Sequence, residues 1–218
     1  MQFVQFMNKN TVNLMINLNA VLNHVKQDVK PLILIGGCSR SGKSTFTEAL
    51  AGEIRNQGHE TLVISADMWL YPASLRKFNS SVMERYRIGE LIDCLNLIQS
   101  GSPVNVKPYN AITRELENFS CTIKPPKTKF IVLLEGVIAL CVNELRSKSF
   151  FNIYVDLDDK TRLKRLILFY RNNKLMNKAD YRVLIREREI EEVIFIKKSA
   201  IYADFIYRNK KNLNTLVK

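Results

Sequence analysis

Short apolar runs alternate along this chain with longer segments in which apolar residues recur at helical spacing. Four of the runs consist largely of aliphatic and aromatic residues, a pattern typical of strands buried on both faces of a sheet. The predicted strands cover residues 32–35, 61–65, 130–134 and 151–155, and residues 203–207 are consistent with a last one. Because long segments separate these strands, we expect βαβ units and a mostly parallel sheet of five strands.

Helical spacing of apolar residues predicts helices over residues 11–27, 44–56 and 90–99. Two further helices rich in charged residues are expected over residues 159–171 and 178 to about 199. Residues 67–89 show no clear period and predict a loop with short helical pieces. Prolines concentrated between residues 103 and 129 predict an irregular insertion with a short hairpin, because proline cannot donate to a strand ladder. The sequence therefore predicts the α/β class.

The composition is that of an ordinary globular domain with an excess of positive charge. The chain has 46% hydrophobic and 25% charged residues, which excludes a disordered or collagen-like protein. Lys and Arg number 33 against 21 Asp and Glu, and the formal net charge of +12 favours anionic partners such as nucleotides. No apolar run is long enough to span a membrane. The four cysteines form no C-x-x-C pair, which predicts reduced thiols in a cytoplasmic protein.

The strongest chemical signal lies between the predicted strand 32–35 and the predicted helix 44–56. Residues Gly37-Cys38-Ser39-Arg40-Ser41-Gly42-Lys43-Ser44 match the phosphate-loop pattern G-x-x-x-x-G-K-[ST] in full. The glycines let successive backbone N–H groups face phosphate oxygens, and the helix adds the positive end of its dipole. Lys43 is expected to reach the β- and γ-phosphates, and the Ser44 hydroxyl to bind Mg²⁺. We therefore predict that residues 37–44 and Thr45 bind ATP with Mg²⁺; a Gly/Ser turn without a ligand is the alternative.

Two acidic residues follow predicted strands and so belong to the same edge of the sheet as the phosphate loop. Asp67 follows residues 61–65, and Glu135 follows residues 130–134. We predict that Asp67 is the general base that accepts the proton of a substrate hydroxyl, and that Glu135 assists Mg²⁺ through water. For each acid, a helix cap or a loop carboxylate is the alternative. Asp156 ends the run 151–155, where a helix-capping role is favoured.

These residues resemble, in family order, the uridine kinase group of P-loop kinases, which also includes phosphoribulokinase and bacterial pantothenate kinase. The matching segments are Gly36 to Thr45, Ser65-Ala66-Asp67, Gly101 to Val104 with Pro108-Tyr109, Leu133 to Val137, Asp156 with Arg162 and Arg165, and Tyr202-Ala203-Asp204. The resemblance covers residues 31–207. It implies a three-layer α/β/α P-loop NTPase fold and an ATP-dependent kinase that phosphorylates a hydroxyl group of a small molecule.

The pattern and the resemblance together divide the chain into an N-terminal helix packed on the domain, a kinase domain and a polar tail. These parts cover residues 1–30, 31–207 and 208–218. Within the domain, residues 103–129 would be a substrate-side insertion, and residues 159–188 a lid with its following helix. Arg162 and Arg165 lie three residues apart on a helix, and in a closing lid they would stabilise charge on the transferred phosphoryl group.

The acceptor half departs from the family pattern. Trp69 and Tyr71 are expected where the family has an aromatic residue after the catalytic base, and Tyr109 where a tyrosine lies over the substrate's nucleobase. Arg87 stands in place of the acid that holds a ribose, and Arg114 in place of a histidine. These replacements add positive charge to the predicted substrate site.

Three functions remain open. The first is phosphorylation of the 5′-hydroxyl of uridine or cytidine. The second is phosphorylation of an acidic or phosphorylated sugar-like alcohol, which Arg85, Arg87 and Arg114 would bind bidentately. The third is a nucleic-acid-linked P-loop ATPase, suggested by the basic residues between 160 and 188, although few aromatic residues alternate with them. We therefore expect a small-molecule partner rather than nucleic acid or a membrane, and leave a homo-oligomer open.

Overall fold

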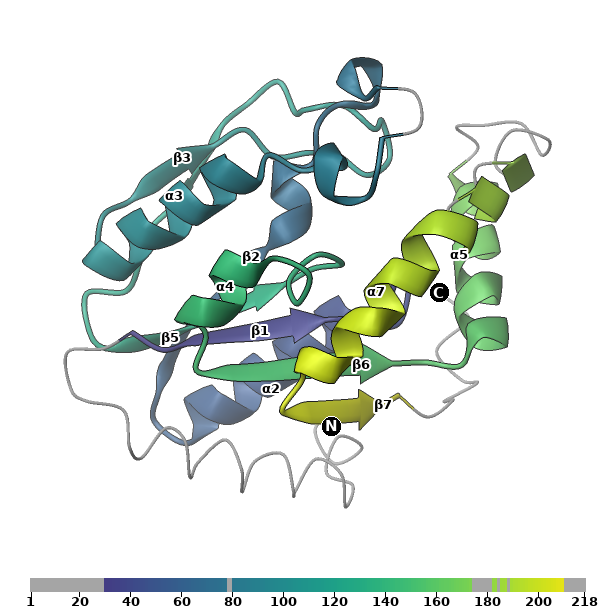
Figure 1. Cartoon of the computed structure of the whole chain (residues 1–218). Helices are drawn as coiled ribbons and strands as arrows, with labels where there is room; N and C mark the ends of the chain where they lie inside the picture. The colour runs from purple at the N-terminus through teal and green to yellow at the C-terminus, as the bar shows by residue number, and fades with distance from the viewer. Residues whose placement is uncertain (1–29, 78–79, 174–181, 184, 188, 210–218) are drawn as a thin grey trace.

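The computed structural model describes residues 30–77, 80–173, 182–183, 185–187 and 189–209. Its centre is a five-stranded sheet in the order β2-β5-β1-β6-β7 (Figure 1). The strands are β1 (Leu32–Gly36), β2 (Glu60–Ser65), β5 (Phe130–Glu135), β6 (Phe151–Asp156) and β7 (Phe205–Arg208). Every neighbouring pair is parallel; Ile33 of β1, for example, lies opposite Leu133 of β5 and Phe151 of β6. The predicted parallel sheet of five strands is confirmed.

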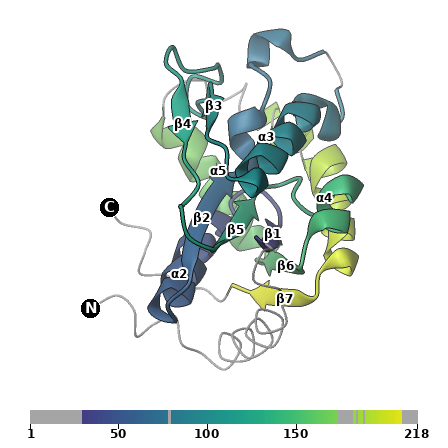
Figure 2. The same cartoon turned by 90° about the vertical axis from the view of Figure 1, so that its left-hand side faces the viewer.

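Helices cover both faces of this sheet, as the end-on view in Figure 2 shows. The α-helices are α2 (Lys43–Asn56), α3 (Ile88–Ser100), α4 (Asn143–Lys148), α5 (Asp159–Asn172) and α7 (Ile194–Lys198). Leu32 and Leu34 of β1 belong to a core shared with α3, α4 and α7, whereas Ile33 and Ile35 belong to a core shared with α2. Side chains alternate along a strand, so the wholly apolar β1 supplies two cores at once and produces the three layers.

The segments that carry the predicted acceptor residues are irregular. Between β2 and α3 the chain forms three short 3₁₀ turns: η2 (Ala66–Trp69), η3 (Ala73–Leu75) and η4 (Met83–Arg85). After α3, the strands β3 (Val104–Val106) and β4 (Cys121–Ile123) pair antiparallel. The predicted loop with helical pieces and the predicted hairpin are both confirmed.

The helices differ from prediction in two places. No helical period marks α4, because six residues are too few to show one. The expected capping role of Asp156 is wrong: Asp156 ends β6, and the side chain of Asp158 caps α5 by accepting a hydrogen bond from the Thr161 N–H at 2.9 Å. The cap sits at Asp158 because two more residues are needed to turn from the strand into the helix.

Two predicted helices lie wholly or partly outside the described residues. The predicted helix 11–27 lies outside them entirely, and the predicted helix 178–199 lies outside them at residues 178–181, 184 and 188. The later part of that helix contains a π-helical turn at Glu189–Val193 before α7 begins. None of the helices in the described part of the chain is long and apolar enough to cross a membrane.

Candidate active site

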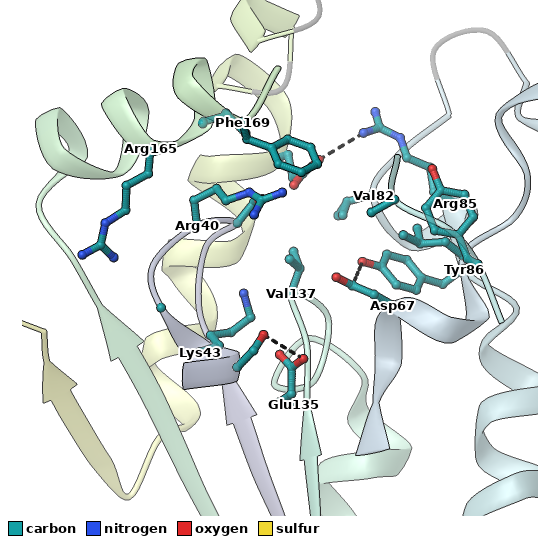
Figure 3. A pocket seen from close by; sticks show the side chains of 18 of the residues that line it. Arg40, Lys43, Asp67, Val82, Arg85, Tyr86, Glu135, Val137, Arg165 and Phe169 are labelled. Atoms are coloured by element: carbon teal, nitrogen blue, oxygen red, sulfur yellow. Dashed lines mark hydrogen bonds and ion pairs between the residues drawn. The ribbon is translucent and has the colours of Figure 1, made fainter. Parts of the chain in front are cut away.

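A cavity of about 1000 Å³ opens where the strands of the parallel sheet end. One wall is the phosphate loop after β1, a second consists of residues from the 67–86 segment and the 109–114 loop, and a third is α5. Figure 3 shows side chains from these walls around the common space. Because parallel strands present their carboxyl ends at one edge, segments far apart in the sequence meet here.

The backbone of the phosphate loop requires glycine. Gly37 has φ +141°, and a Cβ at this position would lie 2.4 Å from the carbonyl oxygen of Val155. Gly42 has φ +97° and comes immediately before α2, so the unpaired first N–H groups of that helix lie where the loop borders the cavity. The loop therefore packs closely against β6 at Gly37 and leaves the N-terminus of α2 open to the cavity, an arrangement that can bind an anion.

Polar groups of the loop turn toward its centre. The Cys38 carbonyl accepts hydrogen bonds from the Ser41 N–H and from Lys43 Nζ, both at 3.1 Å. The buried Ser41 Oγ has no hydrogen-bond partner among the residues that the structure describes. The Cys38 thiol points away, toward the Tyr154 hydroxyl at 3.7 Å, and burial raises its pKa, so it is not an activated nucleophile. A lysine ammonium and an unsatisfied hydroxyl inside an amide-lined loop fit the phosphates of a nucleotide.

Most of the predicted nucleotide-binding residues line the cavity. They are Ser39, Arg40, Gly42, Lys43, Ser44 and Thr45. The side chains of Cys38 and Ser41 are instead buried in the loop, where Gly37 supplies the close approach to β6.

The two residues predicted to serve Mg²⁺ contact one another. Ser44 Oγ donates to Glu135 Oε1 at 3.1 Å. Burial raises the pKa of the Glu135 carboxyl, and the nearby Lys43 opposes this rise. A hydroxyl and a carboxylate offer the hard oxygen ligands that Mg²⁺ prefers, and no set of three His, Cys, Asp or Glu side chains among the described residues forms a metal cage. The pair thus fits an ion that takes its remaining ligands from phosphate and water.

Asp67 faces the same space as Glu135 because the ends of β2 and β5 pack closely. Ser65 lies opposite Glu135 in the sheet register, and a Cβ on Gly136 would lie 2.6 Å from the Ala66 Cβ. The charge of Asp67 contributes, after burial, to the raised pKa of Glu135. The Asp67 carboxylate itself is exposed to the cavity and accepts a hydrogen bond from the Tyr86 hydroxyl at 3.0 Å.

The two predicted lid arginines point to different places. Arg165 lines the cavity together with Phe169 of the same helix, whose ring centroid lies 3.6 Å from the Arg40 guanidinium carbon. Arg162 does not line it: its side chain is buried and forms ion pairs with Glu189 and with Asp159. Arg162 therefore ties α5 to the segment before α7 in this structure.

Some of the predicted acceptor residues line the cavity and others do not. Tyr109 and Arg114 line the cavity. Trp69 is only 2% exposed and packs in the core, and Tyr71 does not line the cavity. Arg87 does not line the cavity: its side chain, which is only 13% exposed, pairs with Glu90 at 2.6 Å and donates to the Met68 carbonyl at 3.1 Å. The structure thus brings two of the five together with the phosphate loop.

Several cavity residues carry no signal in the sequence. They are Tyr86, Arg76 and Glu192, which line the cavity and lie in irregular turns or far along the chain, so neither periodicity nor a motif marks them. Arg85, which the sequence marks as a candidate for binding an anionic acceptor, also lines the cavity and pairs with Glu192 at 3.1 Å. Only the tertiary fold brings these residues to the cavity that holds Asp67.

A family model described as "Phosphoribulokinase / Uridine kinase family" matches residues 32–213. The uridine kinase of Enterobacter sp. is 29% identical over 194 residues, which cover 83% of this chain and 88% of that protein. Uridine kinase-like protein 5 of Arabidopsis thaliana is 22% identical over 187 residues, which cover 81% of this chain but only 39% of the length of that relative.

A solved structure of similar fold is that of a possible uridine kinase from Bacillus stearothermophilus. It matches with a TM-score of 0.57 and 21% identity, over 89% of this chain and 97% of that one. At this identity the likeness supports the P-loop kinase fold and nothing finer.

Proposed function

Because the chain belongs to the phosphoribulokinase and uridine kinase family, we propose that its cavity transfers the γ-phosphoryl group of ATP to a hydroxyl group of a small molecule. The observation that carries the proposal is the meeting of three groups in one cavity: Lys43 in its amide-lined loop, the Ser44–Glu135 pair, and Asp67. Phosphoryl transfer needs an anion cradle, oxygen ligands for a metal, and an acceptor for the proton of the nucleophile.

In this mechanism the Asp67 carboxylate takes the proton of the acceptor hydroxyl while that oxygen attacks the γ-phosphorus. The bond from phosphorus to the β,γ-bridging oxygen breaks, and ADP leaves. Lys43 and Arg165, both lining the cavity, neutralise charge on the transferred group. Mg²⁺, when bound beside Ser44 and Glu135, would screen the β- and γ-phosphates.

The first candidate acceptor is the 5′-hydroxyl of uridine or cytidine. The names of the curated relatives support it, as does Tyr109, whose ring lines the cavity and could stack on a nucleobase. A ribose also needs an acceptor for its 2′- and 3′-hydroxyls. Glu192 is a cavity carboxylate of this kind, and it also pairs with Arg85 at 3.1 Å.

The second candidate is an acceptor that carries a carboxylate or a phosphate, and two arginines favour it. Arg114 has φ +63°, rare for a residue other than glycine, and its carbonyl accepts from the Ala73 N–H at 2.8 Å. The Arg76 guanidinium donates twice to the Tyr71 carbonyl, at 2.7 and 2.9 Å, and lies 5.1 Å from the Tyr109 ring centroid. Both arginines line the acceptor side of the cavity, where such side chains bind planar anions.

A matched set of acceptors separates these candidates. ADP release would be measured with Mg-ATP and with uridine, cytidine, glycerate, glycerol 3-phosphate, uncharged glycerol or a short oligonucleotide. Stimulation by a nucleoside alone supports the first candidate. Stimulation by glycerate or glycerol 3-phosphate but not by glycerol supports the second. Stimulation by oligonucleotides alone would contradict the proposed small-molecule kinase.

The role of Asp67 is tested by one substitution. Asp67→Asn should keep Mg-ATP binding but lower turnover at least about a hundredfold, because an amide cannot act as general base. Asp93→Asn, which alters an exposed carboxylate of α3, is the matched control and should retain full turnover. Wild-type turnover in Asp67→Asn would remove the basis of the mechanism.

A further inference from the structure

We propose that Tyr86 is a positioning residue for the reaction, and that its hydroxyl holds the Asp67 carboxylate in the orientation that receives the substrate's proton. This inference rests on the proposed function, because the orientation of Asp67 matters only if Asp67 is the base. Figure 3 shows the two side chains meeting at the edge of the cavity, opposite Lys43 and Glu135.

The contact occupies only one oxygen of the carboxylate. The Tyr86 hydroxyl donates to Asp67 Oδ1 at 3.0 Å. The torsion that turns a carboxylate about its Cβ–Cγ bond is broad, so an exposed aspartate does not hold one orientation unaided. A hydrogen bond to Oδ1 limits this rotation, and the lone pairs of Oδ2 stay available for the hydroxyl of the acceptor.

The backbone makes the tyrosine a fixed support. Residues after Asp67 and residues around Tyr86 form a short antiparallel bridge between Leu70 and Tyr86. On either side of it, the Tyr71 N–H donates to the Arg85 carbonyl and the Arg87 N–H donates to the Trp69 carbonyl, both at 2.8 Å. These main-chain bonds hold the backbone at Tyr86 beside the segment that directly follows the turn of Asp67, which limits how far the two side chains can separate.

The ring of Tyr86 is also held by packing. It is 7% exposed and belongs to the same hydrophobic core as Trp69, Val82 and Leu91. A hydroxyl at the end of a packed ring has little freedom to lose, which is what preorganised support of a reacting group requires. Asp67, by contrast, is exposed to the cavity, so the hydrogen bond contributes to the geometry of the site more than to stability.

Tyr86→Phe is the direct test, because it removes the hydroxyl and keeps the ring. We expect turnover at saturating substrates to fall roughly tenfold to a hundredfold, as small displacements of a reacting group do. The KM for ATP and the melting temperature should not change. Tyr202→Phe, which alters an exposed tyrosine that stacks on Arg146 and does not line the cavity, should behave as wild type.

A double-mutant cycle with Asp67→Asn separates this inference from the proposed function. If Tyr86 acts through Asp67, Tyr86→Phe should cause no further loss in the Asp67→Asn background. An equal further loss there would show that Tyr86 acts on the substrate itself and would overturn the positioning role. Wild-type turnover in Tyr86→Phe, with Asp67→Asn impaired, would overturn only this inference, whereas wild-type turnover in Asp67→Asn would overturn the proposed mechanism.

Discussion

Removing either partner of the buried Arg162–Glu189 ion pair should destabilise the protein, and removing the glutamate should cost more. The side chain of Arg162 is 2% exposed and that of Glu189 is 27% exposed. Glu189→Leu leaves a guanidinium in the interior whose remaining carboxylate is Asp159 at 3.5 Å. Arg162→Met leaves a carboxylate that water can partly reach. The difference in burial therefore predicts the order of the two variants.

The expected size follows from the cost of an uncompensated buried charge. Breaking a buried pair from one side costs about 3 to 5 kcal/mol, and we assign this range to Glu189→Leu. For Arg162→Met, water at the carboxylate should reduce the cost to roughly half. A protein of this length loses about 2 to 4 °C of melting temperature per kcal/mol, so Glu189→Leu should melt about 6 to 20 °C below wild type. The double variant should recover part of the loss, because no buried charge remains.

Thermal unfolding followed by circular dichroism shows which of the two variants is the less stable. ADP release, measured well below the melting temperature, gives the activity of the folded protein. Lys197→Met is the matched control: it breaks an ion pair with Asp159 whose partners are 43% and 57% exposed, and should cost less than about 1 kcal/mol. The reasoning is refuted if Arg162→Met is the more damaging variant. If instead Arg162→Met keeps its melting temperature and loses turnover, the guanidinium reaches the nucleotide in a closed lid.

Two further predictions concern the phosphate side of the cavity. Glu135→Gln should abolish Mg-dependent turnover and, without nucleotide, raise the melting temperature at neutral pH, because burial disfavours the charged carboxylate and so raises the folded-state pKa of Glu135. The gain in melting temperature should vanish as the pH falls below the ordinary glutamate pKa of about 4.3, where the carboxyl is protonated in both states. A gain that persists in acid would show that the buried charge is not its cause. Gly37→Ala should eliminate the thermal shift caused by Mg-ATP, since φ is +141° and the new Cβ would meet the Val155 carbonyl oxygen at 2.4 Å, whereas Gly89→Ala, with no atom within 4 Å of its Cβ, should bind normally.

The phosphate side could be predicted because its chemistry is written in adjacent residues. One contiguous motif sets the curl of the loop and places Lys43 and Ser44, and a buried strand and a helix confirm its setting. Asp67 and Glu135 followed from a single topological rule about the ends of parallel strands. The structure brings all four residues to one cavity.

Only two of the five predicted acceptor residues line the cavity, because the backbone on the acceptor side is irregular. Trp69, at the end of a short 3₁₀ turn, enters the core, and Arg87, just before α3, bonds to Glu90 and to the Met68 carbonyl. No sequence period encodes these directions. Arg162 and Arg165 were expected on one face, but positions three apart differ by about 60° around a helix. That rotation is enough for Arg165 to line the cavity while Arg162 is buried.

The acceptor wall is held by contacts of its own, and this explains how it can depart from the family pattern while the phosphate loop does not. Ser74 bonds to the Glu115 carboxylate at 3.0 Å, and the Ala73 N–H bonds to the Arg114 carbonyl. Neither contact involves the loop at residues 37–44, whose hydrogen bonds run to β6, to Glu135, to Asn209 and within the loop itself. Side chains on the acceptor wall can therefore change without disturbing the amides that face the phosphates. The residues that would bind ATP and the residues that would bind the acceptor are thus held by separate sets of hydrogen bonds. The substrate must therefore be identified from the acceptor side of the cavity and not from the phosphate loop.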